Sequence, residues 1–162
     1  MPQLDLPTVD GRRARIGGAR PTWQVVVVYR GRHCPLCKKY LTKLQSLAGD
    51  LAQANAEVIA VSGDPQEKAQ ADTTELNLKI PVAYGLTLEQ MRTLGLYISN
   101  PRSPQETDRP FAEPGLFVVN PQGQVQIVDI SNAPFARPDL DGILRGIKLI
   151  QEKHYPIRGT AA

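Results

Sequence analysis

The sequence predicts an α/β protein in which a mixed β-sheet lies between helices. Strand-like apolar runs alternate with helical periodicities in the first half of the chain, and a hairpin pattern follows in the second half. Alternation favours parallel strands joined by helices, whereas a hairpin adds antiparallel strands to the same sheet. The 162 residues suffice for one domain with its own core, and no repeat or linker divides them. We therefore expect residues 1–162 to form a single domain.

The first three predicted elements are a hairpin, a buried strand and an amphipathic helix. Asp10-Gly11 lies between two short segments within residues 4–16, and this dipeptide is a strong signal for a tight turn. The run Trp23–Tyr29 is rich in valine, which is typical of a central strand covered on both faces. From Leu36 to Leu51, leucine and tyrosine recur every three or four residues, so a long helix is expected there.

The middle of the chain alternates between strands and helices. The expected elements are a buried strand at 57–62, a polar helix to about 76, a short strand at 80–84 and a short helix from 87 to about 95. Asp64 is expected to cap the first of these helices, with Pro65 in its first turn. Gly95 is expected to end the second.

The last third of the chain begins with an irregular stretch and returns to regular structure. Residues 99–114 contain four prolines, which predict a surface excursion. The segments 116–119 and 125–130 are joined by Asn120-Pro121-Gln122-Gly123 and form the clearest hairpin in the sequence. A final helix is expected from Pro138 to about Lys153, and residues 154–162 are expected to be a tail.

Charge and hydropathy exclude several classes of partner. Nineteen basic residues against sixteen acidic ones leave a net charge of +3, which is too small to require nucleic acid or an anionic membrane. The longest apolar run is far shorter than a membrane span, and the first residues do not have the pattern of a signal peptide. We therefore expect a cytoplasmic protein that binds neither nucleic acid nor membrane.

The two cysteines, Cys34 and Cys37, lie where the buried strand leaves the sheet and the long helix begins. Residues three apart share one face of a helix, so the two thiols can form a disulfide. Cys34 is expected at the helix N-terminus, which favours an anion, and should be the more acidic thiol. Cys37 should be less exposed and act as the second sulfur. Pro35 suits the first helical position because it has no N–H to lose.

The residues around the cysteines suggest redox chemistry rather than metal binding. Arg30 and Arg32, together with two nearby lysines, should raise the local potential, and His33 is a candidate to stabilise the Cys34 thiolate. Tetrahedral zinc needs four ligands, whereas only His33 and His154 could join the cysteines, and His33 is poorly placed to do so. We therefore expect no metal site and no bound cofactor.

The run Val27–Cys37 is similar to the peroxiredoxin-like branch of the alkyl hydroperoxide reductase and thiol-specific antioxidant family. The Asp10-Gly11 hairpin, the strand at 58–64 and the run Pro114–Gly123 match that family in the same order, so the resemblance covers roughly residues 4–153. It implies a thioredoxin-like fold and an antioxidant role in cell redox homeostasis. It also places Pro114 at the cis-proline of thioredoxin-like proteins, where the backbone of Glu113 would be exposed beside Cys34.

The sequence departs from the usual peroxiredoxin motif, Pro-x-x-x-Thr/Ser-x-x-Cys, in two ways. The motif would require proline at Val27 and a hydroxyl residue at Gly31. The active-site arginine of that family falls at about Pro114 in this chain. Arg30, Arg32 or Arg109 are candidates to replace that cation.

Three functions follow from these observations. The first is a peroxidase in which Cys34 reduces hydrogen peroxide or an organic hydroperoxide, Cys37 resolves the sulfenate, and a dithiol donor such as thioredoxin or glutaredoxin resets the disulfide. The second is a protein disulfide reductase that uses the same two cysteines, which the departures from the motif favour. The third is a binding module without catalysis. The resemblance favours the first, and a homodimer is possible.

Overall fold

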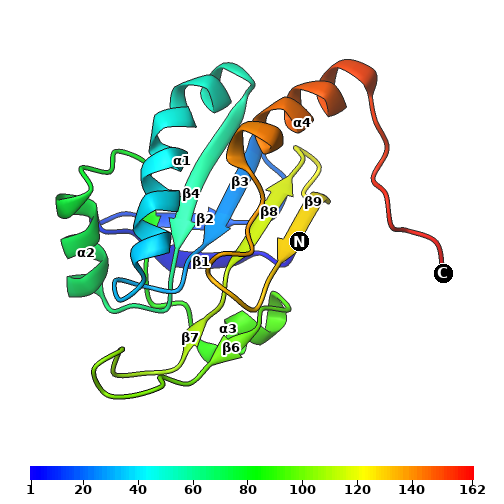
Figure 1. Ribbon diagram of the computed structural model, residues 1–162. Helices are drawn as coiled ribbons and strands as arrows, with labels where there is room; N and C mark the ends of the chain where they lie inside the picture. Colours follow the sequence, from blue (N-terminus) through cyan, green and yellow to red (C-terminus); the bar gives the residue numbers. More distant parts are fainter.

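The computed structural model describes residues 1–162, and a five-stranded mixed sheet lies at its centre (Figure 1). The strand order is β5-β4-β3-β8-β9. These strands are β3 (Trp23–Val28), β4 (Ala56–Val61), β5 (Val82–Ala83), β8 (Gly115–Val119) and β9 (Val125–Ile130). The first three run parallel, and β8 and β9 are antiparallel to their neighbours. The predicted mixed sheet is therefore confirmed, with the hairpin β8–β9 at one edge.

The helices and a separate N-terminal hairpin cover the two faces of the sheet. The helices are α1 (Pro35–Gln53), α2 (Gln66–Glu75), α3 (Leu88–Thr93) and α4 (Leu140–Lys153), and the hairpin strands are β1 (Leu4–Pro7) and β2 (Arg13–Ile16). Alternate residues of a strand point to opposite faces. Val25 and Val27 accordingly pack with the leucines of α1 and α4, whereas Val26 and Val28 pack with the N-terminal hairpin and α3.

The hairpin and the long helix form where local signals predict them. Gly11 has a φ of +83°, the left-handed conformation that the tight turn requires, and Leu4 pairs with Ile16 across the ladder. In α1 the predicted apolar residues are buried against the sheet, and the exposed fractions of Leu41 and Leu44 are at most 1%. The start of α1 therefore meets the end of β3 at one edge of the core.

Asp64 does not cap α2, which corrects the prediction. The N-cap of that helix is Pro65, which makes no side-chain cap bond. The Asp64 carboxylate instead accepts a hydrogen bond from the Arg32 N–H at 2.7 Å. The residue therefore ties the loop before Cys34 to the end of β4, and a tertiary contact takes the place of the expected local one.

The stretch from 99 to 114 is more than a surface excursion. Two short strands, β6 (Ile98–Ser99) and β7 (Phe111–Ala112), pair across its base. Phe111 and Glu113 are buried and contact His33 and Arg30, so the returning half of the excursion packs against the loop that leads to the cysteines. The prolines and charged residues of this stretch are typical of an exposed loop, so the sequence pattern does not indicate that Phe111 and Glu113 are buried.

The chain ends beyond α4 in residues that form neither helix nor strand. His154 has a φ of +50° and terminates the helix, and most of residues 154–162 are exposed. None of the helices combines the length and the apolar character that crossing a membrane requires.

Candidate active site

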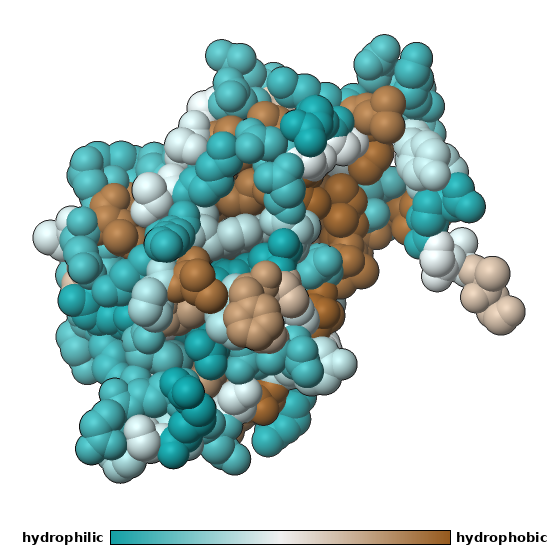
Figure 2. Space-filling model, viewed as in Figure 1, coloured by the Kyte–Doolittle hydropathy of each residue, from teal (hydrophilic) through white to brown (hydrophobic).

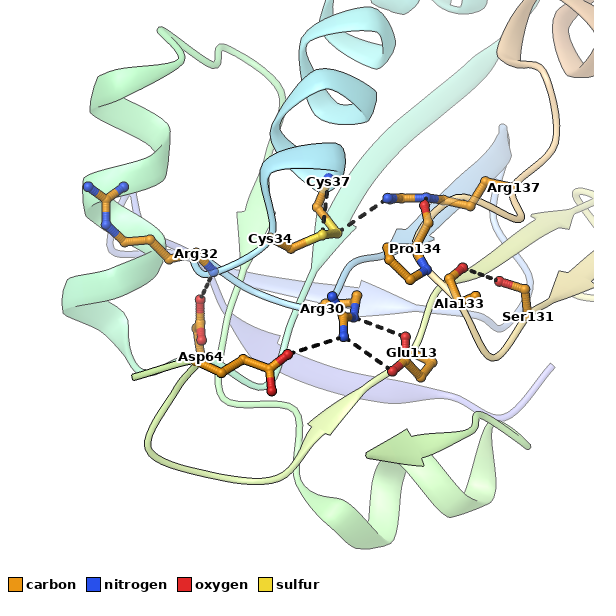
Figure 3. Close-up of a disulfide and its surroundings, with 11 residues drawn as sticks. Arg30, Arg32, Cys34, Cys37, Asp64, Glu113, Ser131, Ala133, Pro134 and Arg137 are labelled. Atoms are coloured by element: carbon orange, nitrogen blue, oxygen red, sulfur yellow. Dashed lines mark hydrogen bonds and ion pairs between the residues drawn. A yellow bond between two sulfur atoms is a disulfide. The ribbon is translucent and has the colours of Figure 1, made fainter. Parts of the chain in front are cut away.

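Cys34 and Cys37 form a disulfide at the N-terminus of α1 (Figure 3). Their Cα atoms are 5.2 Å apart, within the normal range for a disulfide. Cys34 is the N-cap residue, and its Sγ accepts a hydrogen bond from the Cys37 N–H at 3.2 Å. The exposed fractions of the two residues are 1% and 0%, so position in the helix distinguishes them better than burial does.

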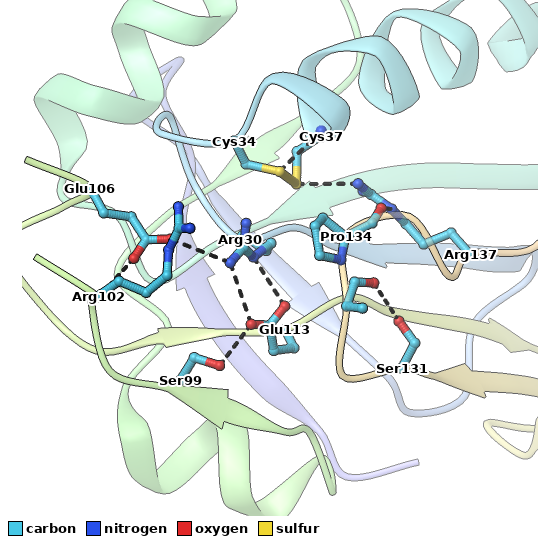
Figure 4. Close-up of polar contacts among 11 residues, drawn as sticks. Arg30, Cys34, Cys37, Ser99, Arg102, Glu106, Glu113, Ser131, Pro134 and Arg137 are labelled. Carbon is cyan, nitrogen blue, oxygen red and sulfur yellow. Dashed lines mark hydrogen bonds and ion pairs between the residues drawn. A yellow bond between two sulfur atoms is a disulfide. The ribbon is translucent and has the colours of Figure 1, made fainter.

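Arg30 lies below the disulfide in a cluster of opposite charges (Figure 4). Its Nε is 3.0 Å from Glu113 Oε2, and its Nη2 is 3.6 Å from Glu106 Oε1. The guanidinium also lies over the ring of Phe111, 4.8 Å from its centre. Two carboxylates therefore balance the charge of Arg30, which corrects the expectation that this residue adds net positive potential at Cys34.

Arg32 is directed away from the sulfurs, toward α2 (Figure 3). Its Nη1 is 2.8 Å from both Asp72 Oδ1 and Glu75 Oε2. Burial raises the pKa of Asp72, although the hydrogen bond from Arg32 acts in the opposite direction. Arg109 pairs with Asp108 at 2.9 Å on the surface. Neither Arg32 nor Arg109 contacts a cysteine, so neither replaces the cation of the family motif.

Arg137 is the cation that reaches the disulfide, and sequence reasoning missed it. Its Nη2 donates to Cys37 Sγ at 3.4 Å, and its Nε donates to the Pro134 oxygen at 2.8 Å (Figure 3). The guanidinium lies over the ring of Tyr40, 4.6 Å from its centre. Burial lowers the pKa of Arg137. The residue is 100 positions from Cys37 in a loop without a motif, so no local pattern indicates it.

His33 packs as an aromatic side chain rather than as a ligand of the thiolate. Its ring meets Phe111 edge-on with centroids 4.5 Å apart, and neither ring nitrogen has a hydrogen-bond partner. Burial is the main cause that lowers the pKa of His33, and the charge of Arg30 adds to it. The imidazole is therefore neutral at neutral pH and makes no bond to Cys34.

Pro35 lies where the sequence predicts it, whereas Pro114 does not have the cis bond of thioredoxin-like proteins. Pro35 stands at the start of α1 as predicted. The Glu113–Pro114 bond is trans, since the chain contains no cis peptide, so the cis alternative that the family resemblance raised for Pro114 does not apply. The Glu113 N–H donates to the Tyr97 oxygen at 2.8 Å. That backbone group is therefore already used and is not available to an extended substrate chain.

Comparison with known proteins agrees with this geometry. A family model described as the AhpC/TSA family matches residues 1–128, which is most of the chain. The chain belongs to the AhpC/TSA family. Members of this family are thiol-dependent oxidoreductases, and the assignment confirms the resemblance seen in the sequence. No curated protein matches the chain in a sequence search.

Solved structures of peroxiredoxins share the fold of this AhpC/TSA member. A peroxiredoxin-like protein from Aquifex aeolicus superposes with a TM-score of 0.77 at 19% identity, covering 91% of this chain and 82% of its own. Peroxidoxin BcpB from Mycobacterium tuberculosis gives 0.73 at 19% identity, with coverages of 93% and 94%. AhpC from Enterococcus faecalis gives 0.74 at 19% identity, with coverages of 97% and 95%. The thioredoxin-like fold is therefore confirmed.

One departure from the family motif has a steric cause in this AhpC/TSA member. Gly31 stands where the motif has Thr or Ser, and its φ of +137° lies in a region that side chains rarely adopt. A Cβ at this position would lie 2.8 Å from Asp64 Oδ1. A hydroxyl residue at position 31 would therefore strain the backbone and push against the carboxylate that accepts the Arg32 N–H.

Proposed function

We propose that this AhpC/TSA member is a thiol peroxidase in which Cys34 attacks the peroxide and Cys37 resolves the product. The observation that carries the proposal is the disulfide between the N-cap residue of α1 and the residue one turn further on. The free N–H groups of a helix N-terminus stabilise an anion there. Cys34 is therefore suited to be the thiolate, and Cys37 is already within bonding reach of it.

In the first half of the cycle, the Cys34 thiolate attacks one oxygen of the O–O bond. An S–O bond forms, the O–O bond breaks, and the leaving oxygen takes a proton and departs as water or an alcohol. The Cys37 thiolate then attacks Sγ of the Cys34 sulfenic acid, and the displaced hydroxide leaves as water with one proton. Two electrons have passed from the two sulfurs to the peroxide, and the disulfide remains.

The disulfide must be reduced by a dithiol for the cycle to turn over. A protein dithiol such as thioredoxin or glutaredoxin supplies the two electrons and becomes a disulfide itself. Such donors are kept reduced in the cytoplasm, so we place the protein in that compartment. No bound cofactor takes part in either half of the cycle.

A protein disulfide reductase is the second candidate. It is favoured by Gly31 and Pro114, which stand where peroxiredoxins carry their hydroxyl and arginine. The Glu113 N–H weakens this candidate because it is bonded to Tyr97 and does not offer a backbone edge to a substrate chain.

Two assays on the reduced protein separate these candidates. We expect rapid consumption of hydrogen peroxide or cumene hydroperoxide in the presence of a dithiol donor, and slow reduction of insulin disulfides. The reverse ranking would favour the disulfide reductase. A protein inactive in both assays, whose cysteines react no faster than free cysteine, would instead be a binding module.

We further propose that a second copy of the chain pairs along β9. Ser131 N–H donates inward to the Pro114 oxygen at 3.1 Å, so the alternating ladder leaves the backbone groups of Val128 and Ile130 directed outward. Hydrophobic atoms form a band from α4 along this edge (Figure 2), and Val128 is 56% exposed. In an antiparallel pairing centred on Val128, Asp129 faces Ile127 of the other copy, and no like charges oppose each other.

The pairing predicts a dimer that a lysine at the centre of the edge disrupts. A charged side chain on an edge strand opposes strand addition. Sedimentation should give a dimer for the unmodified protein and a monomer for Val128→Lys. The control Gln70→Lys places the same charge at an exposed position of α2, which packs beside β5 at the opposite edge of the sheet, and should leave the dimer intact. A monomer at every concentration of the unmodified protein would refute the pairing.

A further inference from the structure

We propose that Arg137 serves the return half of the cycle by stabilising Cys37 as the thiolate that leaves when a dithiol attacks the disulfide at Cys34. The inference rests on the proposed cycle for its physiological meaning. Its basis is the contact of 3.4 Å between Arg137 Nη2 and Cys37 Sγ. Arg137 is thus a catalytic residue for a step distinct from peroxide reduction.

Arg137 is a cation that contacts a sulfur directly, and no carboxylate pairs with it. Arg30 pairs with Glu113 and Glu106, and Lys38 pairs with Glu75 at 3.0 Å. Arg137 forms no ion pair, and its buried Nη1 has no hydrogen-bond partner. Burial lowers the pKa of this guanidinium, so an anion placed beside it would be strongly favoured. The only sulfur it contacts is that of Cys37.

The arginine is held in this position by a rigid frame. The Tyr40 hydroxyl donates to the Pro138 oxygen at 2.7 Å, and the guanidinium of Arg137 lies over the Tyr40 ring. The Arg137 Nε donates to the Pro134 oxygen at 2.8 Å. Helix α1 and the loop before α4 therefore hold the guanidinium next to Cys37 without any contribution from the disulfide itself.

The two sulfurs receive different stabilising groups. Cys34 Sγ accepts the Cys37 N–H at 3.2 Å at the start of the helix. Cys37 lies one turn further along, where the backbone N–H groups are used within the helix, and its Sγ accepts only from Arg137. The helix N-terminus thus stabilises a thiolate at Cys34, and Arg137 stabilises one at Cys37.

Because Arg137 stabilises a thiolate at Cys37 rather than at Cys34, it acts on the leaving sulfur when the disulfide is reduced. A donor thiolate attacks Cys34 Sγ, the Cys34–Cys37 bond breaks, and its electron pair goes to Cys37 Sγ beside the guanidinium. The second donor thiolate then attacks the donor sulfur of the mixed disulfide and releases Cys34. The donor leaves as a disulfide, and each cysteine regains a proton from water. A leaving thiol of lower pKa leaves faster, so Arg137 accelerates the first of these steps.

The test compares Arg137→Met with two other variants in both halves of the cycle. Arg137→Lys keeps the positive charge, and Arg145→Met removes an exposed arginine of α4 that pairs with Asp139 and contacts neither cysteine. The disulfide is formed in each protein with diamide, and its reduction by dithiothreitol is followed by intrinsic fluorescence or thiol release. We expect Arg137→Met to be reduced about threefold or more slowly, because only about half of a one-unit rise in the pKa of the leaving thiol is expressed in the rate.

A second measurement tests whether Arg137 acts on Cys37 specifically or on the whole site. In a Cys34→Ser background, thiolate absorbance should show the pKa of Cys37 rising by about one unit or more in Arg137→Met. The rate of peroxide oxidation of Cys34, measured in a Cys37→Ser background, should stay within about twofold. Arg137→Lys should recover part of the reduction rate, and Arg145→Met should match the unmodified protein.

Two results would overturn the assignment. One is reduction of Arg137→Met at the unmodified rate, and the other is slowing confined to the oxidation of Cys34 by peroxide. Because diamide and dithiothreitol require no peroxidase activity, slow reduction of Arg137→Met in a protein that does not consume peroxide would support this inference while refuting the proposed function.

Discussion

Replacing Cys34 with serine is expected to lower steady-state peroxide turnover on the order of a thousandfold or more, the scale seen when an enzyme loses its nucleophile. A serine hydroxyl is not ionised near neutral pH and does not attack the O–O bond. Coupled consumption of a dithiol donor in the presence of hydrogen peroxide measures the effect directly.

Cys37→Ser is the matched variant, because it removes the other half of the same disulfide and leaves the nucleophile in place. Its first turnover should proceed near the unmodified rate, after which Cys34 remains as a sulfenic acid that excess peroxide oxidises further. If Cys34→Ser retained turnover while Cys37→Ser lost even the first oxidation event, the roles of the two cysteines would be reversed.

Replacing Arg30 with methionine is expected to destabilise the fold by about 3–5 kcal/mol, the cost of breaking a buried ion pair from one side. The side chains of Arg30 and Glu113 are 15% and 5% exposed, and their closest atoms are 3.0 Å apart. Methionine leaves the Glu113 carboxylate buried with only the Ser99 hydroxyl, which donates to it at 2.7 Å. Urea denaturation of the reduced protein measures the loss.

The double variant Arg30→Met/Glu113→Leu distinguishes an unpaired charge from lost packing. It should recover most of the stability that the single substitution removes, since no buried carboxylate is left without a partner. Arg12→Met provides the control, because Arg12 is almost fully exposed, pairs only with the exposed Asp10, and its removal should leave the denaturation midpoint unchanged. A double variant as unstable as Arg30→Met would show that packing against Phe111, rather than charge, dominates.

The elements that the sequence predicts correctly are those with a complete local signal. The valines of β3 and the leucines of α1 specify a buried strand followed by a helix, and the cysteines at their junction could therefore be placed at a helix N-terminus. The turn at Asp10-Gly11 likewise needs only its two residues, because glycine accepts the required φ.

The features that sequence reasoning misses depend on partners far along the chain. Asp64 is a residue type that often caps helices, but its carboxylate instead accepts a hydrogen bond from the Arg32 N–H. Arg30 and Arg32 lie beside the cysteines in sequence, yet carboxylates from other elements neutralise them. Arg137 reaches Cys37 only because the loop before α4 packs against Tyr40. Charge at the site is thus set by tertiary contacts, which a local pattern does not contain.

The most direct test of the account is the oxidation of Cys34 by a single equivalent of hydrogen peroxide in the reduced Cys37→Ser variant. Intact-mass spectrometry with dimedone trapping should find one oxygen added, located on Cys34, within the first seconds of the reaction. The unmodified protein should instead lose two hydrogens and form the Cys34–Cys37 disulfide. A Cys37→Ser protein that remains unmodified, or that oxidises no faster than free cysteine, would contradict the account.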